Sequence, residues 1–316
     1  MGEVQMFEEV NMAEESQAAD ESQTTEESQT AEESQAAEES RLIGFGEALR
    51  NVRETVPLIH NITNYVTVND CANALLAIGA SPIMADEAKE VEDITSICAG
   101  LNINIGTLNL GTIHSMFLAG EKAVALGHPV VLDPVGAGAS KLRTDTARLI
   151  MDTLDVTVVR GNMSEVKTLA KGSGSTKGVD VCVDDAVTEG NLDEAVRFVK
   201  GYARECGAVV AVTGAIDIVT DGEVAYCIRN GHPLMGRVTG TGCQLSGLTC
   251  AFVAANRGHA LEATAAAVAS MGLAGEIAHG RMGELDGNSS YRNYIIDALF
   301  NLTPDRLEKG ARYELR

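Results

Sequence analysis

Residues 129–170 read PVVLDPVGAGASKLRTDTARLIMDTLDVTVVRGNMSEVKTLA and carry one pattern twice. In each half, a short apolar run (129–132 or 156–159) precedes a loop and then a stretch of helical spacing (145–153 or 164–170). Continuous apolar runs are typical of strands that are covered on both faces. The repeat therefore predicts strand–helix units, and such units favour a parallel sheet.

The same alternation extends in both directions. Further strands are expected at 83–85, 101–105, 209–213, 217–220 and 224–229, and further helices at 68–78, 91–99, 115–126 and 192–206. The chain then becomes mostly helical, at 242–256, 261–279 and 291–302. We expect an α/β fold with a mainly parallel central sheet, helices on both faces and an edge hairpin that turns at Asp221-Gly222. Ligands of such sheets bind beyond the carboxyl ends of the strands.

The first forty residues differ in composition from the rest. They contain thirteen acidic residues and neither Lys nor Arg, and Glu-Ser-Gln recurs every six residues between Glu15 and Gln35. Such a segment has too little apolar surface to offset the entropy of ordering it. We expect residues 1–40 to be a disordered acidic tail and residues 41–316 to form a single domain.

Charge and cysteine content exclude several classes of function. The net charge is −21, of which the tail contributes −13, so nothing in the chain attracts nucleic acid or an anionic membrane. The seven Cys residues are an odd number without a CxxC pair, which favours reduced thiols. No apolar run reaches the ~20 residues of a membrane span, and no secretory signal pattern is present, so a cytoplasmic protein is expected.

Gly240-Thr241-Gly242-Cys243 opens one of the long C-terminal helices. Backbone N–H groups at a helix start converge on an anion, and the helix dipole favours negative charge there. A kinase needs such a site for the charge on the transferred phosphoryl group. The alternative is an ordinary helix entry with Thr239 or Thr241 as the N-cap.

Two other loops follow strand ends. Asp133, in Asp-Pro-Val-Gly-Ala-Gly, could lie near a magnesium ion or phosphate, or could only form a turn. Arg160 could bind phosphate, and Glu165 could hold magnesium through water. Asn162 and Glu165 also have the spacing of a capping box, and both interpretations can hold together.

The remaining polar positions are less specific. Thr213 ends a strand and could contact a nucleotide phosphate or only lead into the turn at Gly214. His60, beside Asn61 and Asn64 in PLIHNITNYVTVN, is interpreted as a structural histidine rather than a ligand.

Two common nucleotide-binding motifs are not matched. Gly247 follows Gly242 by five residues rather than the three of a dinucleotide fingerprint, and no strand with an acidic residue comes after it. Residues 172–177 (GSGSTK) lack the Gly-Lys-Ser/Thr ending of a Walker P-loop.

Together these segments closely resemble the hydroxyethylthiazole kinase family of the ribokinase-like superfamily. The matching segments, between about residues 55 and 260, are PLIHNITNYV, NALLAIGASPIMA, INIGTL, VVLDPVGAGAS, VVRGN, VTGAIDIV and VTGTGCQLSG. The resemblance implies a ribokinase-like three-layer sandwich. It also implies phosphorylation of the hydroxyl of 4-methyl-5-(2-hydroxyethyl)thiazole in thiamine biosynthesis, with ATP as co-substrate and Mg2+ as cofactor, by a homotrimer whose active sites lie between subunits.

The resemblance also implies roles for individual residues. Gly240, Thr241 and Gly242 correspond to the anion hole, and Cys243 corresponds to the family's reactive-site cysteine, where related sugar kinases carry an aspartate base. A helix N-terminus can lower a thiol pKa from its usual ~8.5, so a thiolate at Cys243 is plausible.

The binding positions follow in the same way. Arg160 and Thr213 match the ATP-contacting residues, and Met84 and Gly240 match positions that contact the thiazole alcohol. Asn162 and Glu165 correspond to an element that organises magnesium, and Asp133 is a further candidate neighbour of magnesium or phosphate.

Three other interpretations stay open on the sequence. One is a related kinase of another small alcohol, such as hydroxymethylpyrimidine. Another is an ATP- or ADP-dependent dehydratase of the same fold, although that class carries Asp where Cys243 stands. The last is a non-catalytic sensor of nucleotide or thiazole.

Overall fold

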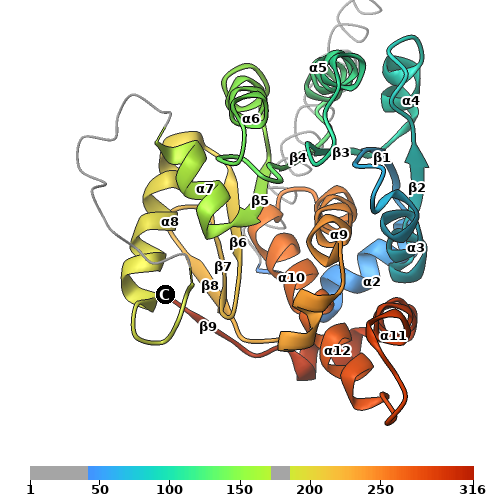
Figure 1. Ribbon diagram of the computed structural model, residues 1–316, viewed down its shortest axis with the longest axis vertical. Coiled ribbons are helices and arrows are strands. Elements are labelled where there is room, and N and C mark those ends of the chain that lie inside the picture. The colour runs from blue at the N-terminus through green and yellow to red at the C-terminus, as the bar shows by residue number, and fades with distance from the viewer. Residues whose placement is uncertain (1–41, 172–185) are drawn as a thin grey trace, which may run out of the picture. The chain divides into compact units, whose positions relative to one another are not determined.

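Nine strands form one sheet within residues 42–171 and 186–316, the part of the chain that the computed structural model describes (Figure 1). The expected acidic tail and residues 172–177 lie outside this part. The strand order is β2-β1-β3-β4-β5-β6-β7-β8-β9. Neighbours from β2 to β6 pair in parallel, whereas β7, β8 and β9 are antiparallel. The mainly parallel sheet that the sequence predicts is confirmed.

The elements have the following bounds. The strands are β1 Leu58–Ile62, β2 Ser81–Met84, β3 Gly100–Asn104, β4 Val130–Asp133, β5 Val158–Asn162, β6 Val209–Thr213, β7 Asp217–Thr220, β8 Ala225–Ile228 and β9 Tyr313–Leu315. The helices are α2 Phe45–Thr55, α3 Val68–Ile78, α4 Val91–Ile97, α5 Leu110–Ala125, α6 Lys141–Thr153, α7 Met163–Ala170, α8 Leu192–Cys206, the 3-10 helix η1 Pro233–Arg237, α9 Thr241–Ala255, α10 Ala260–Gly280, α11 Asn288–Phe300 and α12 Pro304–Gly310.

Alternation along the strands divides the buried apolar residues into two layers of core. Val131 and Val158 face one core, whereas their neighbours Leu132 and Val159 face the other. The first core is completed by α2, α3 and α9–α12, and the second by α4–α8 (Figure 1). Helices therefore cover both faces of the sheet, which gives the expected three-layer α/β architecture.

Helix α9 lies against the parallel part of the sheet, where it contacts β1, β3 and β4. Small residues allow this close approach: an ideal Cβ on Gly100 of β3 would lie 2.9 Å from the Sγ atom of Cys250. The amino end of α9 thus lies beside the carboxyl ends of these strands. No helix among the described residues is both long and apolar enough to cross a membrane.

Several elements were not expected from the sequence. Strand β1 was missed because His60 and Asn61 interrupt its apolar pattern, yet both are buried. Helices α2 and α12 and strand β9 were also missed. The hairpin of β7 and β8 turns at Asp221-Gly222 as expected, but it is not the edge of the sheet, because β9 pairs with β8.

Candidate active site

The first turn of α9 has open backbone N–H groups. Its N-cap is Gly240, at φ +83°, and no side chain caps the helix, so the alternative interpretation with Thr239 or Thr241 as N-cap is wrong. A Cβ on Gly240 would lie 2.8 Å from the Cβ of Thr67, so both the positive φ and the close contact require glycine. The amides of this turn are therefore available to an anion.

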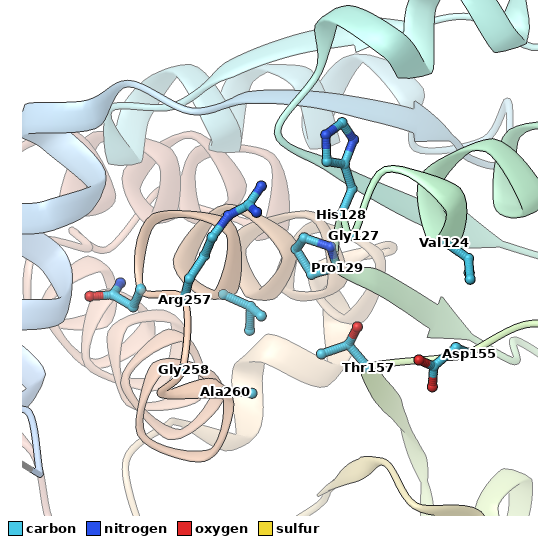
Figure 2. A pocket seen from close by; sticks show the side chains of 11 residues that line it. Val124, Gly127, His128, Pro129, Asp155, Thr157, Arg257, Gly258 and Ala260 are labelled. Carbon is cyan, nitrogen blue, oxygen red and sulfur yellow. The ribbon is translucent and has the colours of Figure 1, made fainter. Parts of the chain in front are cut away.

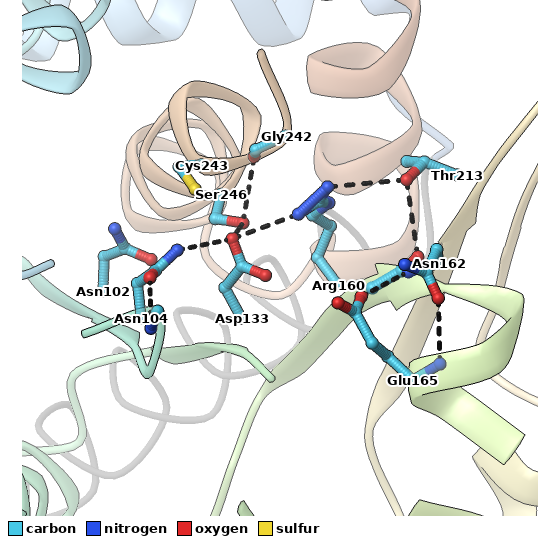
Figure 3. A network of polar contacts seen from close by, with 12 residues as sticks. Asn102, Asn104, Asp133, Arg160, Asn162, Glu165, Thr213, Gly242, Cys243 and Ser246 are labelled. Carbon is cyan, nitrogen blue, oxygen red and sulfur yellow. Dashed lines mark hydrogen bonds and ion pairs between the residues drawn. The ribbon is translucent and has the colours of Figure 1, made fainter. Parts of the chain in front are cut away.

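Asp133, at the end of β4, is the centre of a buried polar network (Figure 3). Its Oδ2 atom accepts hydrogen bonds from Asn104 Nδ2 at 2.7 Å and Ser246 Oγ at 2.8 Å, and it lies 3.1 Å from Arg160 Nη1. Its Oδ1 atom is buried without a partner among the described residues. One carboxylate oxygen therefore holds three groups, and the other can accept a further ligand.

Arg160 joins this network to the neighbouring strand. It lies within β5, where the sequence had placed it just after the strand, and its Nη2 atom is 3.5 Å from Thr213 Oγ1 at the end of β6. Burial disfavours its charge, but the carboxylates of Asp133 and Glu165 outweigh that effect and raise the pKa of Arg160. The guanidinium is thus charged and fixed beside the first turn of α9.

Glu165 forms the capping box that its spacing indicates. Asn162 is the N-cap of α7 and accepts from Glu165 N at 2.9 Å, while Glu165 accepts from Asn162 N at 2.8 Å. Its other oxygen accepts from Gly136 N at 2.8 Å. Burial raises the pKa of Glu165, although the two backbone N–H donors oppose that rise. This carboxylate therefore ties the loop after β4 to the start of α7.

Cys243 lies on the sheet side of the first turn of α9. Its Sγ atom accepts from Asn64 Nδ2 at 3.2 Å. Burial and the charge of Asp133 raise its pKa, with Arg160, Asn104 and Thr67 acting in the opposite direction. The lowering expected from the helix terminus is thus outweighed, and the thiol form is favoured.

A cleft of about 530 Å3 opens beside this network. It is lined by four predicted site residues: Arg160, Thr213, Thr241 and Gly242. The lining continues over residues 229–233, Met235 and Met271. One cleft therefore contains the amino end of α9, the guanidinium of Arg160 and apolar lining residues.

Met84 is not joined to this cluster by any contact that the structure records among its described residues. It ends the edge strand β2, where its backbone is paired with that of Asn61 on β1. His60 is structural, as expected: its ring nitrogens lie 2.9 Å from Thr95 Oγ1 and 2.9 Å from the carbonyl oxygen of Ala85, just beyond Met84.

A divalent cation fits part of this arrangement. The described residues contain no group of three or more His, Cys, Asp or Glu side chains that could enclose a metal ion. The unpartnered Oδ1 of Asp133 and the carboxylate of Glu165 supply oxygen ligands of the kind that Mg2+ prefers, and Mg2+ usually completes its shell with water and substrate phosphates.

Three network residues were missed by sequence reasoning, namely Asn64, Asn104 and Ser246. The available signal was the recurrence of Asn at strand ends, in Asn61-Ile-Thr-Asn64 and Asn102-Ile-Asn104. Asn64 and Asn104 come together because β1 and β3 are adjacent and in register, whereas Ser246 reaches Asp133 from helix α9.

A second cavity, of about 260 Å3, lies at the opposite, amino-terminal edge of β4 and β5 (Figure 2). Its lining includes His128, Asp155, Thr157 and Arg257, and none of the predicted site residues. It therefore lies apart from the candidate active site.

Comparison with known proteins gives a consistent result. The sequence model of the hydroxyethylthiazole kinase family matches residues 49–305. A hydroxyethylthiazole kinase of Clostridium acetobutylicum is 60% identical over 268 residues, which cover 85% of this chain and 98% of that protein. One from Clostridium beijerinckii is 49% identical over 267 residues, which cover 84% and 95%.

Solved structures agree with this result. The hydroxyethylthiazole kinase protein from Pyrococcus horikoshii OT3 superposes with a TM-score of 0.77 at 41% identity, covering 86% of this chain and 98% of that one. The pyridoxal kinase of Staphylococcus aureus in complex with pyridoxal has a TM-score of 0.53 at 16% identity, covering 82% and 97%, which supports the ribokinase-like fold alone.

Proposed function

The chain belongs to the hydroxyethylthiazole kinase family, and we propose that it transfers the γ-phosphoryl group of ATP to the hydroxyethyl oxygen of 4-methyl-5-(2-hydroxyethyl)thiazole. The products are ADP and the thiazole phosphate, a step of thiamine biosynthesis. One observation carries the proposal: the uncapped first turn of α9 opens into the same cleft as Arg160 and Thr213. Relatives up to 60% identical, named hydroxyethylthiazole kinase, support the choice of substrate.

The amides of residues 240–243 stabilise the charge on the transferred group. Phosphoryl transfer passes through a loose transition state, so positioning and charge stabilisation supply most of the catalytic effect. The N–H groups of this turn have no side-chain cap, and the positive end of the 15-residue helix α9 is directed at the same place. Both contributions are present before substrate binds, so little reorganisation is needed.

Arg160 and Thr213 bind the phosphates of ATP. A guanidinium with five N–H donors suits phosphate oxygens, and Asp133 holds this guanidinium at 3.1 Å. Asp133 and Glu165 would hold magnesium through their carboxylate oxygens. When bound, Mg2+ neutralises negative charge that develops on the phosphate oxygens.

Cys243, Gly240 and Met84 form the alcohol side of the site. In the reaction, the hydroxyethyl oxygen attacks phosphorus, the bond between phosphorus and the ADP oxygen breaks, and the hydroxyl proton passes to solvent water. Because the thiol pKa of Cys243 is raised, we propose that its sulfur orients the hydroxyl and that a strong base is not required. Met84 supplies apolar contact to the thiazole ring.

We extend the proposal to assembly and location. We place the catalytic domain at residues 41–316, since the family match covers residues 49–305 and Ile43–Arg316 make one compact unit. The protein acts in the cytoplasm as a homotrimer with active sites between subunits. Support comes from three exposed apolar side chains near the site: Tyr65 (78% exposed), Val66 (62%) and Leu110 (84%).

The test is a direct assay of the purified protein with Mg-ATP and hydroxyethylthiazole. We expect thiazole phosphate and ADP in equal amounts, and no product when hydroxymethylpyrimidine replaces the thiazole. A folded protein that binds ATP but forms no thiazole phosphate would refute the proposal.

A further inference from the structure

Asn64 connects the two sides of the candidate active site. Its Nδ2 atom donates to Cys243 Sγ at 3.2 Å and to Asn104 Oδ1 at 3.1 Å. Asn104 in turn donates to Asp133 Oδ2 at 2.7 Å, and Asp133 holds Arg160. Asn64 and Asn104 are 4% and 1% exposed, so water does not compete for these contacts.

Backbone donors determine which way each amide points. The N–H of Thr67 donates to Asn64 Oδ1 at 3.1 Å, and the N–H of Gly106 donates to Asn104 Oδ1 at 2.9 Å. A backbone N–H can only donate, so each contact must be made by the amide oxygen. The NH2 group of Asn64 is therefore directed at Cys243 and Asn104, and that of Asn104 at Asp133.

This orientation restricts the chemistry at position 243. The sulfur receives a hydrogen bond from Asn64 on its sheet side, so the S–H hydrogen must point elsewhere. A carboxylate at the same position would accept the same N–H. The network therefore selects a hydrogen-bond acceptor at position 243 and holds it at a constant place relative to Asp133 and Arg160.

We propose that Asn64 and Asn104 are positioning residues for phosphoryl transfer. They hold Cys243, on the alcohol side of the site, at a constant position relative to Asp133 and Arg160 on the phosphate side. This inference rests on the proposed function. If Asn64 had a purely structural role, only the hydrogen bonds that its amide oxygen accepts from Thr67 would matter.

The variant Asn64→Asp separates the two roles, because it keeps an oxygen for the Thr67 N–H and removes both N–H donors. We expect kcat to fall about 10- to 100-fold, as for a lost buried hydrogen bond, while KM for the thiazole changes less than about threefold. The matched control is Asn191→Asp at the start of α8, which also accepts from a backbone N–H three residues away and also donates through its Nδ2 atom, and it should keep wild-type kcat.

A double-mutant cycle shows whether Asn64 acts through position 243. In a Cys243→Ala background, replacement of Asn64 should lower kcat by less than about threefold. Equal losses in both backgrounds, or a kcat for Asn64→Asp within twofold of wild type, would overturn the inference. If the buried charge prevents folding, the uncharged Asn64→Ala enters the same cycle with the same expected coupling.

Wild-type turnover is measured first, so that a failure of the proposed function is recognised separately. Without turnover, alkylation of Cys243 by iodoacetamide, followed by peptide mass spectrometry, still tests the network. Loss of the N–H donor disfavours the thiolate, so Asn64→Asp should slow alkylation at least about threefold at constant pH. An unchanged or faster rate would overturn the inference.

Discussion

The side chain of Arg160 lies directly against the backbone of Gly242, where Nη1 and Nη2 of Arg160 fill the space that a Cβ atom would need. The same guanidinium lies 3.1 Å from Asp133, and both side chains are almost fully buried. The fixed positive charge of Arg160 thus contacts the first turn of α9 at Gly242, which has no side chain. This contact explains why glycine is required at position 242 although its φ is ordinary.

Gly242→Ala should displace Arg160 and disable the site. We expect kcat/KM for ATP to fall at least about 100-fold, since small misplacements of binding groups cost this much. Steady-state kinetics measures the effect. Gly201→Ala is the control, because nothing lies within 4 Å of its Cβ in helix α8. It should keep full activity and gain roughly 0.5–1 kcal/mol of stability. Normal ATP kinetics in Gly242→Ala would contradict the assignment of Arg160.

Cys243→Ala should be slow but active, and Cys243→Asp should be as fast as the wild type or faster. The physical reason is that a loose transition state needs little base, while a carboxylate is a better acceptor than a thiol whose pKa is raised. Turnover of hydroxyethylthiazole measures both. Complete loss of turnover in a folded Cys243→Ala protein would instead indicate an obligatory thiol.

Arg160→Met should destabilise the fold as well as abolish ATP turnover. It leaves the buried carboxylate of Asp133 without its ion-pair partner, which typically costs about 3–5 kcal/mol in the free energy of unfolding. Adding Asp133→Asn removes the unpaired charge, so the double variant should recover most of the stability but no activity. Urea titrations measure the stability, and a single variant as stable as wild type would contradict the ion pair.

Asp217 makes stability depend on pH. Burial raises its pKa to about 7, against the smaller opposing effects of Gly214 N–H and Arg160. The unfolded value is ~3.9, so the native state binds this proton more tightly. The stability from Asp217 is therefore present below about pH 4 and is lost as the pH rises towards 7.

The variant Asp217→Asn tests that dependence. Between pH 5.5 and pH 8, the free energy of unfolding should fall less for Asp217→Asn than for the wild type, as measured by urea titration. Circular dichroism at both pH values provides the control for an unchanged native state. A larger fall in the variant would mean that Asp217 is not protonated in the native protein at low pH.

The assembly can be tested at Leu110. A charge on this exposed side chain should weaken the proposed subunit interface, so Leu110→Asp should elute as a smaller species with lower turnover. Size-exclusion chromatography with light scattering measures this. Leu285→Asp is the control, because Leu285 is 99% exposed but lies between α10 and α11. A wild-type protein that is monomeric at assay concentration would reject the trimer.

Much of the fold was predictable because its signals are local. The bounds of β6, β7, α3 and α8 agree with the expected ranges, since apolar runs and helical spacing depend on neighbouring residues. Strand β1 has no such signal: His60 and Asn61 are polar, and they are buried only because other elements supply their hydrogen-bond partners. Strand β9, at 313–315, is too short to show a strand pattern of its own, and within the described ranges its pairing partner is β8.

The sequence by itself determined most of the alternation of strands and helices, the family and the positions of Asp133 and Thr213 at the carboxyl ends of strands. Only the tertiary structure decided that Asp133 pairs with Arg160, that Asn64 donates to Cys243 and that the pKa of Cys243 is raised. The reason is physical. The apolar periodicity of a strand or helix depends on residues that are neighbours in the chain. Burial, charge environment and amide orientation depend on groups that are as far apart in the chain as Asn64 and Cys243.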